Sequence, residues 1–132
     1  MRLLVDTNIF IEVLLNQASA DDARAFIENR KGHELYISDF ALHSSGLLLF
    51  RHKQHQVFRQ FLQDVIDRSG VGLVSLNALE IDAVVGTAAE FNLDFDDAYQ
   101  YSAAMKHGLV IVSFDADFDR TTEGRLLPTD AL

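Results

Sequence analysis

The chain has 132 residues, 48% of them apolar, which suits a single domain over residues 1–132, and it has no cysteine for a disulfide or a thiolate metal site. Its formal net charge of −9 argues against a simple nucleic-acid-binding module, because an acidic surface repels phosphate, yet it permits acids gathered around a metal cation. No apolar run reaches the roughly 18 residues of a membrane span, and Asp6 interrupts any signal-peptide core, so we expect a cytoplasmic protein that does not contact a membrane.

Hydrophobic patterning predicts strands that alternate with helices along the chain. Strands are expected at residues 2–5, 34–38, 71–74 and 109–113, with a short edge strand near residues 126–127. Helices are expected at residues 7–16, 19–32, 39–50, 54–68, 78–91 and 94–107. Ser19 and Asn77 are predicted caps, because each has an acid three residues later.

This alternation indicates βαβ units. The strand cores are apolar throughout, as expected when helices cover both faces of a sheet. We therefore predict an α/β protein, a three-layer α/β/α sandwich around a mostly parallel sheet of four or five strands.

Four acids lie where this fold would bring them together. Asp6 ends the first strand, Asp97 opens the last long helix, and Asp115 and Asp117 follow the strand at 109–113. Each has a simpler explanation, since Asp6 and Asp97 are suited to helix starts and Asp115 to a solvated turn. In the first helix, however, Thr7 or Asn8 can provide the cap, which leaves Asp6 available for another role.

The combination is more informative than any single acid. Strand ends and helix starts at the carboxyl edge of a parallel sheet meet in one crevice, where open α/β sheets bind ligands. Clustered carboxylates cannot all ionise without a counter-charge, and Mg²⁺ or Mn²⁺ with oxygen ligands provides it. A metal site of this kind is suited to phosphodiester hydrolysis.

Three segments resemble the PIN-domain family, and within it the VapC-type toxins of bacterial toxin–antitoxin pairs. They begin at Leu4, Leu93 and Leu109, and their sequences are LVDTNIF, LDFDDA and LVIVSFDADF. The resemblance implies a PIN fold, a homodimer, Mg²⁺- or Mn²⁺-dependent endoribonuclease activity on RNA, and inhibition by a small antitoxin inserted near the site. By position, Asp6, Asp97 and Asp115 match the family's catalytic metal ligands, Asp117 an accessory ligand, and Thr7 or Asn8 a supporting polar residue.

The chain departs from the family pattern at one position. The family places a Glu on the helix after the second strand, where this chain has Ser44, preceded by His43. Ser44 is a poor metal ligand, so His43 or Glu12 is a candidate substitute, although a surface or solvated helix position is the more usual explanation for each. A catalytically weakened PIN-like protein that acts as a binding module is therefore an alternative to an active nuclease.

One basic cluster interrupts the acidic chain. Arg51, Lys53 and Arg59 are candidate RNA contacts, or simply cations that complement a helix C-terminus. A phosphate-binding or receiver-like α/β domain is a weaker alternative, because the chain lacks the lysine expected after its last strand. No glycine-rich phosphate loop or catalytic triad pattern is present.

Overall fold

The sheet at the centre of the molecule is parallel throughout. The computed structural model describes residues 1–29, 32–68 and 70–132. In these residues, four strands are ordered β3-β2-β1-β4, with Leu4 of β1 opposite Tyr36 of β2 and Ile111 of β4. The strands are β1 (Arg2–Val5), β2 (Glu34–Ser38), β3 (Gly72–Val74) and β4 (Val110–Val112).

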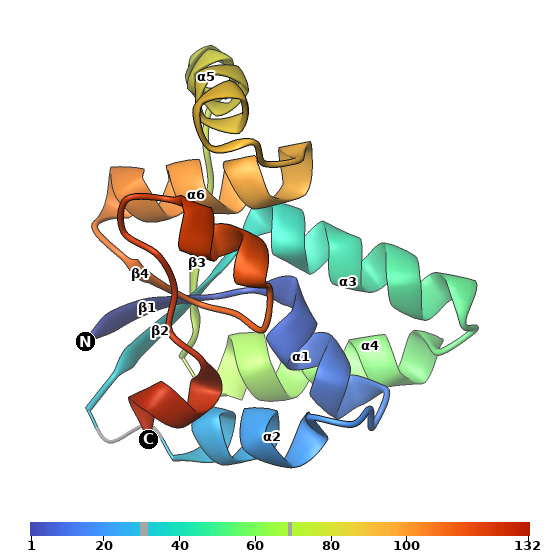
Figure 1. Cartoon of the computed structure of the whole chain (residues 1–132). Coiled ribbons are helices and arrows are strands. Elements are labelled where there is room, and N and C mark those ends of the chain that lie inside the picture. Colours follow the sequence, from blue (N-terminus) through green and yellow to red (C-terminus); the bar gives the residue numbers. More distant parts are fainter. Residues whose placement is uncertain (30–31, 69) are drawn as a thin grey trace.

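Helices cover both faces of this sheet, as Figure 1 shows. One face carries α1, α2 and α4, and the other carries α6, with α5 outside it. The α-helices are α1 (Thr7–Leu14), α2 (Ala20–Glu28), α3 (Asp39–Arg51), α4 (His55–Phe61), α5 (Ile81–Phe91) and α6 (Phe95–His107). Among the described residues, no helix is both long and apolar enough to cross a membrane.

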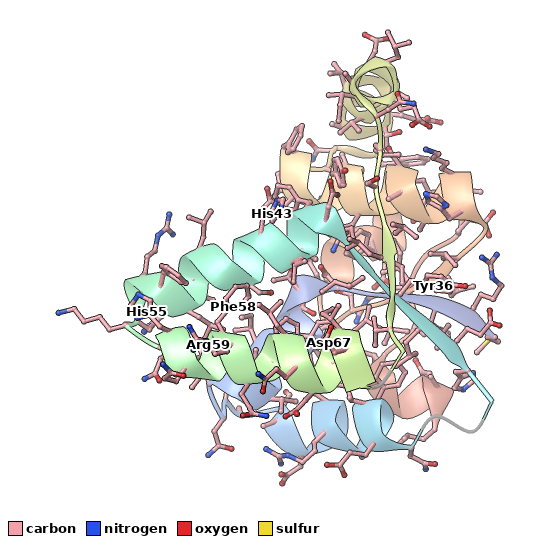
Figure 2. The ribbon with its side chains drawn as sticks, turned by 180° about the vertical axis from the view of Figure 1, so that it is seen from behind. Tyr36, His43, His55, Phe58, Arg59 and Asp67 are labelled. Atoms are coloured by element: carbon pink, nitrogen blue, oxygen red, sulfur yellow. The ribbon has the colours of Figure 1, made fainter. Side chains whose placement is uncertain are left out.

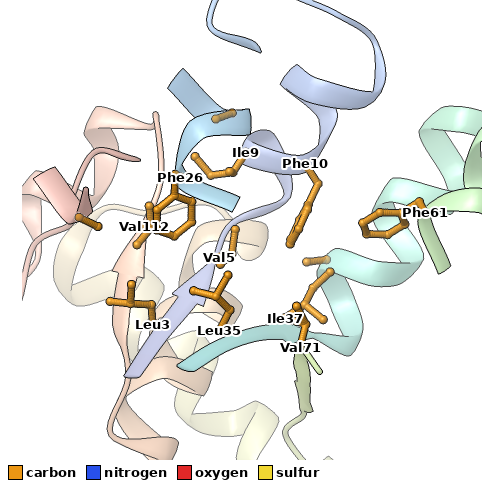
Figure 3. Close-up of a cluster of buried hydrophobic side chains, with 13 residues drawn as sticks. Leu3, Val5, Ile9, Phe10, Phe26, Leu35, Ile37, Phe61, Val71 and Val112 are labelled. Atoms are coloured by element: carbon orange, nitrogen blue, oxygen red, sulfur yellow. The ribbon is translucent and has the colours of Figure 1, made fainter. Parts of the chain in front are cut away.

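The strands are apolar because both of their faces are buried. In β1, Leu3 and Val5 belong to the core cluster beneath α1 and α2, which is drawn in Figure 3. Leu4 points to the opposite face and packs in a second cluster with residues of α6 and β4. This two-sided burial holds β1 rigidly in the middle of the sheet, so the residue after it has a well-defined position.

The chain reverses its direction of travel across the sheet between β1 and β4. From β1 it proceeds through β2 to β3, and it then returns to place β4 on the other side of β1. The carboxyl ends of β1 and β4 are therefore a topological switch point, the place where open α/β sheets form a ligand crevice.

The predicted fold class is confirmed, with four strands and no antiparallel member among the described residues. The prediction of an edge strand near Leu126 is wrong. A single isolated β-bridge joins Leu126 to Val112, and a 3₁₀ helix begins at Pro128. The helix expected at 54–68 becomes a π-helix at Leu62. The helix expected at 19–32 ends at Glu28.

Candidate functional site

Asp6 is a helix cap that also lies at the edge of a polar pocket. It is the N-cap of α1, because its Oδ1 accepts a hydrogen bond of 2.7 Å from the Thr7 backbone amide. The prediction that Thr7 or Asn8 provides this cap is wrong, since both lie inside the helix. Asp6 is nevertheless only 7% exposed and borders a polar pocket at the switch point.

Ser113, the residue after β4, holds the other oxygen of this carboxylate. Its hydroxyl donates to Asp6 Oδ2 at 2.6 Å and accepts from the Asp115 backbone amide at 2.9 Å. Asn8 supports the arrangement, because its amide donates to the Ser113 hydroxyl while its carbonyl oxygen accepts from the Phe114 amide. The predicted supporting residue Asn8 therefore reaches Asp6 through Ser113.

A glutamine from α6 completes the environment of Asp6. The Gln100 side chain is 2% exposed, and its Nε2 donates to Asp6 Oδ1 at 3.1 Å. The Ser38 hydroxyl donates to Gln100 Oε1 at 2.6 Å and accepts from the Ala41 amide, which defines the orientation of the glutamine amide. Ser113 after β4 and Gln100 in the middle of α6 thus hold Asp6 in place, and Ser38 at the end of β2 orients Gln100.

The beginning of α6 positions the second acid. Asp94 caps the helix by accepting from the Asp97 backbone amide, and Asp97 lies in the first turn, as expected of an acid at a helix start. The carboxylate of Asp97 is left to face the pocket, and its residue is 7% exposed.

The loop after β4 brings two further acids to Asp97. Carboxylate oxygens of Asp97, Asp115 and Asp117 all lie within 4.8 Å of one another. Asp115 also accepts from the Asp117 backbone amide, which fixes the turn of the loop. Asp117 is paired with Arg120 at 3.0 Å, and Arg120 is itself anchored to the backbone carbonyls at the end of α5.

The electrostatics of this cluster favour protonated acids in the absence of a cation. Burial raises the pKa of Asp97 to about 8, and a hydrogen bond to the Asp115 carboxyl and the negative charge of Asp115 add to the effect. Burial also raises the pKa of Asp6, although its hydrogen bonds from Ser113, Gln100 and Thr7 act in the opposite direction. A divalent cation among these acids would offset the repulsion between their negative charges.

The pocket between these acids has a volume of about 260 Å³. Ser44 lies on its wall, at the position where the sequence pattern leads one to expect a Glu. Two candidate substitutes for that Glu do not line this pocket. His43 is exposed beside the neighbouring groove, and Glu12 accepts a hydrogen bond from the Ser19 amide. Ser19 occupies the N-cap position of α2, but the predicted hydrogen bond from its side chain is not formed.

The predicted cationic residues lie on the α3–α4 hairpin at different distances from the acids. Arg51 ends α3 and lines a groove that adjoins the acidic pocket. Lys53 lies in the turn after α3, and Arg59 lies on α4, as Figure 2 shows. The structure therefore connects Arg51 to the site most directly.

A family model for the PIN domain matches residues 3–124 of the chain. The chain is a member of the PIN-domain family. The match covers β1, the acids and β4, and it confirms the resemblance seen in the sequence. No curated protein matches the chain in sequence.

Solved structures of similar shape share the PIN fold at low sequence identity. A Mycobacterium tuberculosis toxin, VapC20, described as cleaving the sarcin–ricin loop, has a TM-score of 0.79 and 18% identity over 96% of this chain and 99% of its own. A toxin–antitoxin complex from Klebsiella pneumoniae has a TM-score of 0.73 and 21% identity over 96% and 97%. FitAcB from Neisseria gonorrhoeae has a TM-score of 0.68 and 20% identity over 98% and 99%.

Sequence reasoning did not identify Gln100 and Ser113 as members of the site of this PIN domain. Gln100 follows Asp97 by three residues on α6, which places both on one helical face, and this spacing is the signal that was available. Ser113 and Ser38 each come at the end of a buried strand, where a hydroxyl has little reason to occur without a partner.

Proposed function

We propose that this PIN domain is a Mg²⁺- or Mn²⁺-dependent endoribonuclease that hydrolyses RNA phosphodiester bonds, and that it acts as the toxin of a type II toxin–antitoxin pair. The observation that carries the proposal is the approach of three carboxylates within 4.8 Å at the switch point of a parallel sheet. Membership of the PIN family and the toxin structures that share the fold support it.

The residues fit a hard divalent cation. Asp97, Asp115 and Asp117 offer only carboxylate oxygens, the ligands that Mg²⁺ and Mn²⁺ prefer. When bound, such a cation supplies Lewis-acid stabilisation of phosphate charge and lowers the pKa of a water. The pKa of Asp97, raised to about 8 by burial and by Asp115, is consistent with acids arranged for a cation.

The protein's own groups have separate roles in this proposal. Asp97 and Asp115 would hold the cation, and Asp117, which pairs with Arg120 in the metal-free protein, could provide a third carboxylate. Asp6 orients the catalytic centre as a fixed carboxylate, because Ser113 and Gln100 donate to both of its oxygens. Arg51, Lys53 and Arg59 provide positive charge for the RNA backbone.

The proposal is tested by incubating the purified protein and its Asp6→Asn variant with a structured RNA pool and Mn²⁺. We expect metal-dependent cleavage by the wild type and its loss in the variant, while circular dichroism shows that both are folded. RNA that stays intact with folded wild-type protein, Mn²⁺ and no antitoxin present would contradict the nuclease function.

Ser44 supports a second candidate, a catalytically weakened PIN protein that acts by binding a partner. The α3 wall of the pocket offers a hydroxyl in place of a carboxylate, which reduces the negative charge available to metal. Ser44→Glu distinguishes the candidates. A variant that cleaves RNA while the wild type does not would favour the binding module, whereas cleavage by both supports the nuclease.

A small antitoxin is the proposed protein partner. An apolar groove of about 280 Å³ lies between α1, α2 and α4, with Val13, Ile27 and Val57 among its lining residues. A groove of this kind accepts the apolar face of a helix or an extended segment. We expect the product of a small reading frame immediately upstream to copurify with the protein and to be released by Val57→Asp.

A homodimer is proposed as the assembled state. The outer helix α5 and the turn before it expose Val85 by 64% and Leu79 by 89%, and a second copy would cover both side chains. We expect light scattering to give the mass of a dimer for the wild type and of a monomer for Val85→Lys. A wild-type monomer at all concentrations would contradict this assembly.

A further inference from the structure

A second depression adjoins the acidic pocket along α3. It has a volume of about 350 Å³, and Asp96 at the start of α6 forms its far wall. The α3 wall consists of side chains at successive helical spacings of three and four residues, which place them on one face of the helix. These residues are Phe40, His43, Ser44, Leu47, Leu48 and Arg51.

The six side chains form two rows along α3. Both rows line the groove, but only the inner row also lines the acidic pocket. The inner row of Phe40, Ser44 and Leu48 lines both the acidic pocket and the groove. The outer row of His43, Leu47 and Arg51 lines only the groove. The two depressions therefore share part of their α3 wall, and a ligand with one group at the acids can extend along it.

The chemistry of the groove suits a nucleotide. Leu47 is 61% exposed between His43 and Arg51, so an apolar platform is flanked by two hydrogen-bond donors. Bases stack on apolar or aromatic side chains and on guanidinium planes, and arginine also contacts phosphate. Across the groove, the Asp96 carboxylate can accept a hydrogen bond from an exocyclic amine of a base.

The charge of this surface contrasts with the rest of the molecule. From Phe40 to Gln63 the chain has no acid, although its net charge is −9 overall, and this segment includes Arg51. Ser44 removes the one carboxylate that the PIN pattern would add to the inner row. A polyanion can therefore approach the acidic pocket along α3 with least repulsion.

Figure 2 shows His43 on the half of α3 closer to α6.

We propose that this groove binds one single-stranded nucleotide of the RNA, adjacent to the phosphate held at the acidic pocket, with the base on Leu47 and Phe40 and the neighbouring phosphate at Arg51 and His43. The proposal rests on the nuclease function given above. It limits the substrate to RNA with an unpaired nucleotide beside the cleaved bond, because a base paired within a helix cannot reach the α3 platform.

Binding is measured separately from cleavage. The Asp115→Asn variant serves as the parent, and the fluorescence anisotropy of a labelled single-stranded RNA pool is followed in EDTA. Leu47→Asp and Arg51→Gln added to this parent are each expected to weaken binding at least about fivefold, the scale of one lost base-stacking or phosphate contact. Arg24→Gln is the matched control, because it removes the same charge from an exposed position on α2.

Photocrosslinking locates the contact directly. With RNA that contains 4-thiouridine, the crosslinked tryptic peptide is expected to be residues 32–51, which include the whole α3 wall. If Arg51→Gln and Arg24→Gln weakened RNA binding equally, or if crosslinks were confined to other peptides, the proposal that the groove binds RNA would be wrong. A Leu47→Asp variant that changes the protein's mass in light scattering would show that a second copy covers this surface, and would also overturn it.

The results separate the two proposals. If the wild type cleaves RNA with Mn²⁺ but Leu47→Asp and Arg51→Gln leave RNA binding unchanged, the groove is not an RNA site, while the nuclease function stands. If Leu47→Asp and Arg51→Gln weaken RNA binding but the wild type does not cleave RNA, the groove is an RNA site and the proposed nuclease function is wrong. If the protein neither binds nor cleaves RNA, both proposals are wrong.

Discussion

Asp6 illustrates how a helix cap and a site residue are combined in one side chain. Its Oδ1 accepts from the Thr7 amide and from Gln100, and its Oδ2 accepts from Ser113. The hydroxyl of Ser113 already accepts from the Asp115 amide, so its proton is directed to Asp6. The carboxylate is therefore fixed before any ligand arrives, which is the condition for an effective metal or phosphate site.

Replacing Gln100 with Leu tests this fixation. We expect the Mn²⁺ dissociation constant to rise by up to about tenfold, the scale of outer-shell effects, because Gln100 fixes Asp6 and Asp6 is linked through Ser113 to the backbone of Asp115. We also expect a loss of about 1–3 kcal/mol in the free energy of unfolding, since Asp6 and Ser38 each lose a buried partner. Calorimetry and urea unfolding measure the two effects.

Ser102→Ala is the control for Gln100→Leu, because Ser102 lies on the same helix but bonds to Thr87 on α5. It should leave the affinity for Mn²⁺ unchanged. An unaltered Mn²⁺ affinity in Gln100→Leu would show that Gln100 has only a structural role.

Asp97 makes the stability of the metal-free protein depend on pH. Its pKa is about 8 in the folded protein and near 3.8 when unfolded, so the folded state binds the extra proton between these values. The stabilisation is complete below pH 3.8 and is lost as the pH rises towards 8. We therefore expect the Tm of the metal-free protein to fall between pH 5 and pH 8.

Two changes should remove this dependence. Asp97→Asn has no proton to lose, so its Tm should vary less over the same range. Saturating Mn²⁺ should raise the Tm most at the higher pH, because metal binding requires the deprotonated acids. A wild-type Tm that rises between pH 5 and pH 8 in EDTA would contradict the assignment.

At the scale of elements, the hairpin of α3 and α4 carries the basic residues Arg51, Lys53 and Arg59, of which Arg51 lines the groove beside the acidic pocket. Its packing depends on Gly46, because a Cβ at this position would lie 3.0 Å from the Phe58 ring. The glycine has an ordinary helical position in the sequence, and only the packing explains it. The sequence could predict the two helices from their periodicity, but it could not predict this close contact.

Gly46→Ala is expected to destabilise the protein by about 1 kcal/mol, because overpacking outweighs the gain in helix propensity. Gly86→Ala on α5 is the matched control. A Cβ there meets nothing within 4 Å, so the same substitution should stabilise the protein by up to about 1 kcal/mol. Thermal or urea unfolding of both variants gives the comparison. Equal effects of the same sign would show that the contact with Phe58 is unimportant.

At the scale of the whole molecule, topology assembles a site from residues that are far apart in the sequence. The acids could be predicted because each follows a strand or opens a helix, and parallel strands send these positions to one edge. The spacing of Gln100 from Asp97 places both on one face of α6, but the burial of Gln100 against Asp6 could not be predicted, because in the sequence it looks like any polar residue of a helix. The ion pair of Asp117 with Arg120 also depends on how the loop after β4 folds.

The proposed function depends on a divalent-metal site formed by Asp97, Asp115 and Asp117. Calorimetric titration with Mn²⁺ at neutral pH tests it most directly. The wild type and Asp119→Asn should bind Mn²⁺ alike, because Asp119 lies in the same loop but pairs with Arg125. Asp115→Asn should lose the binding. Absence of Mn²⁺ binding by the wild type, or equal binding by Asp115→Asn, would show that these carboxylates do not form a metal site.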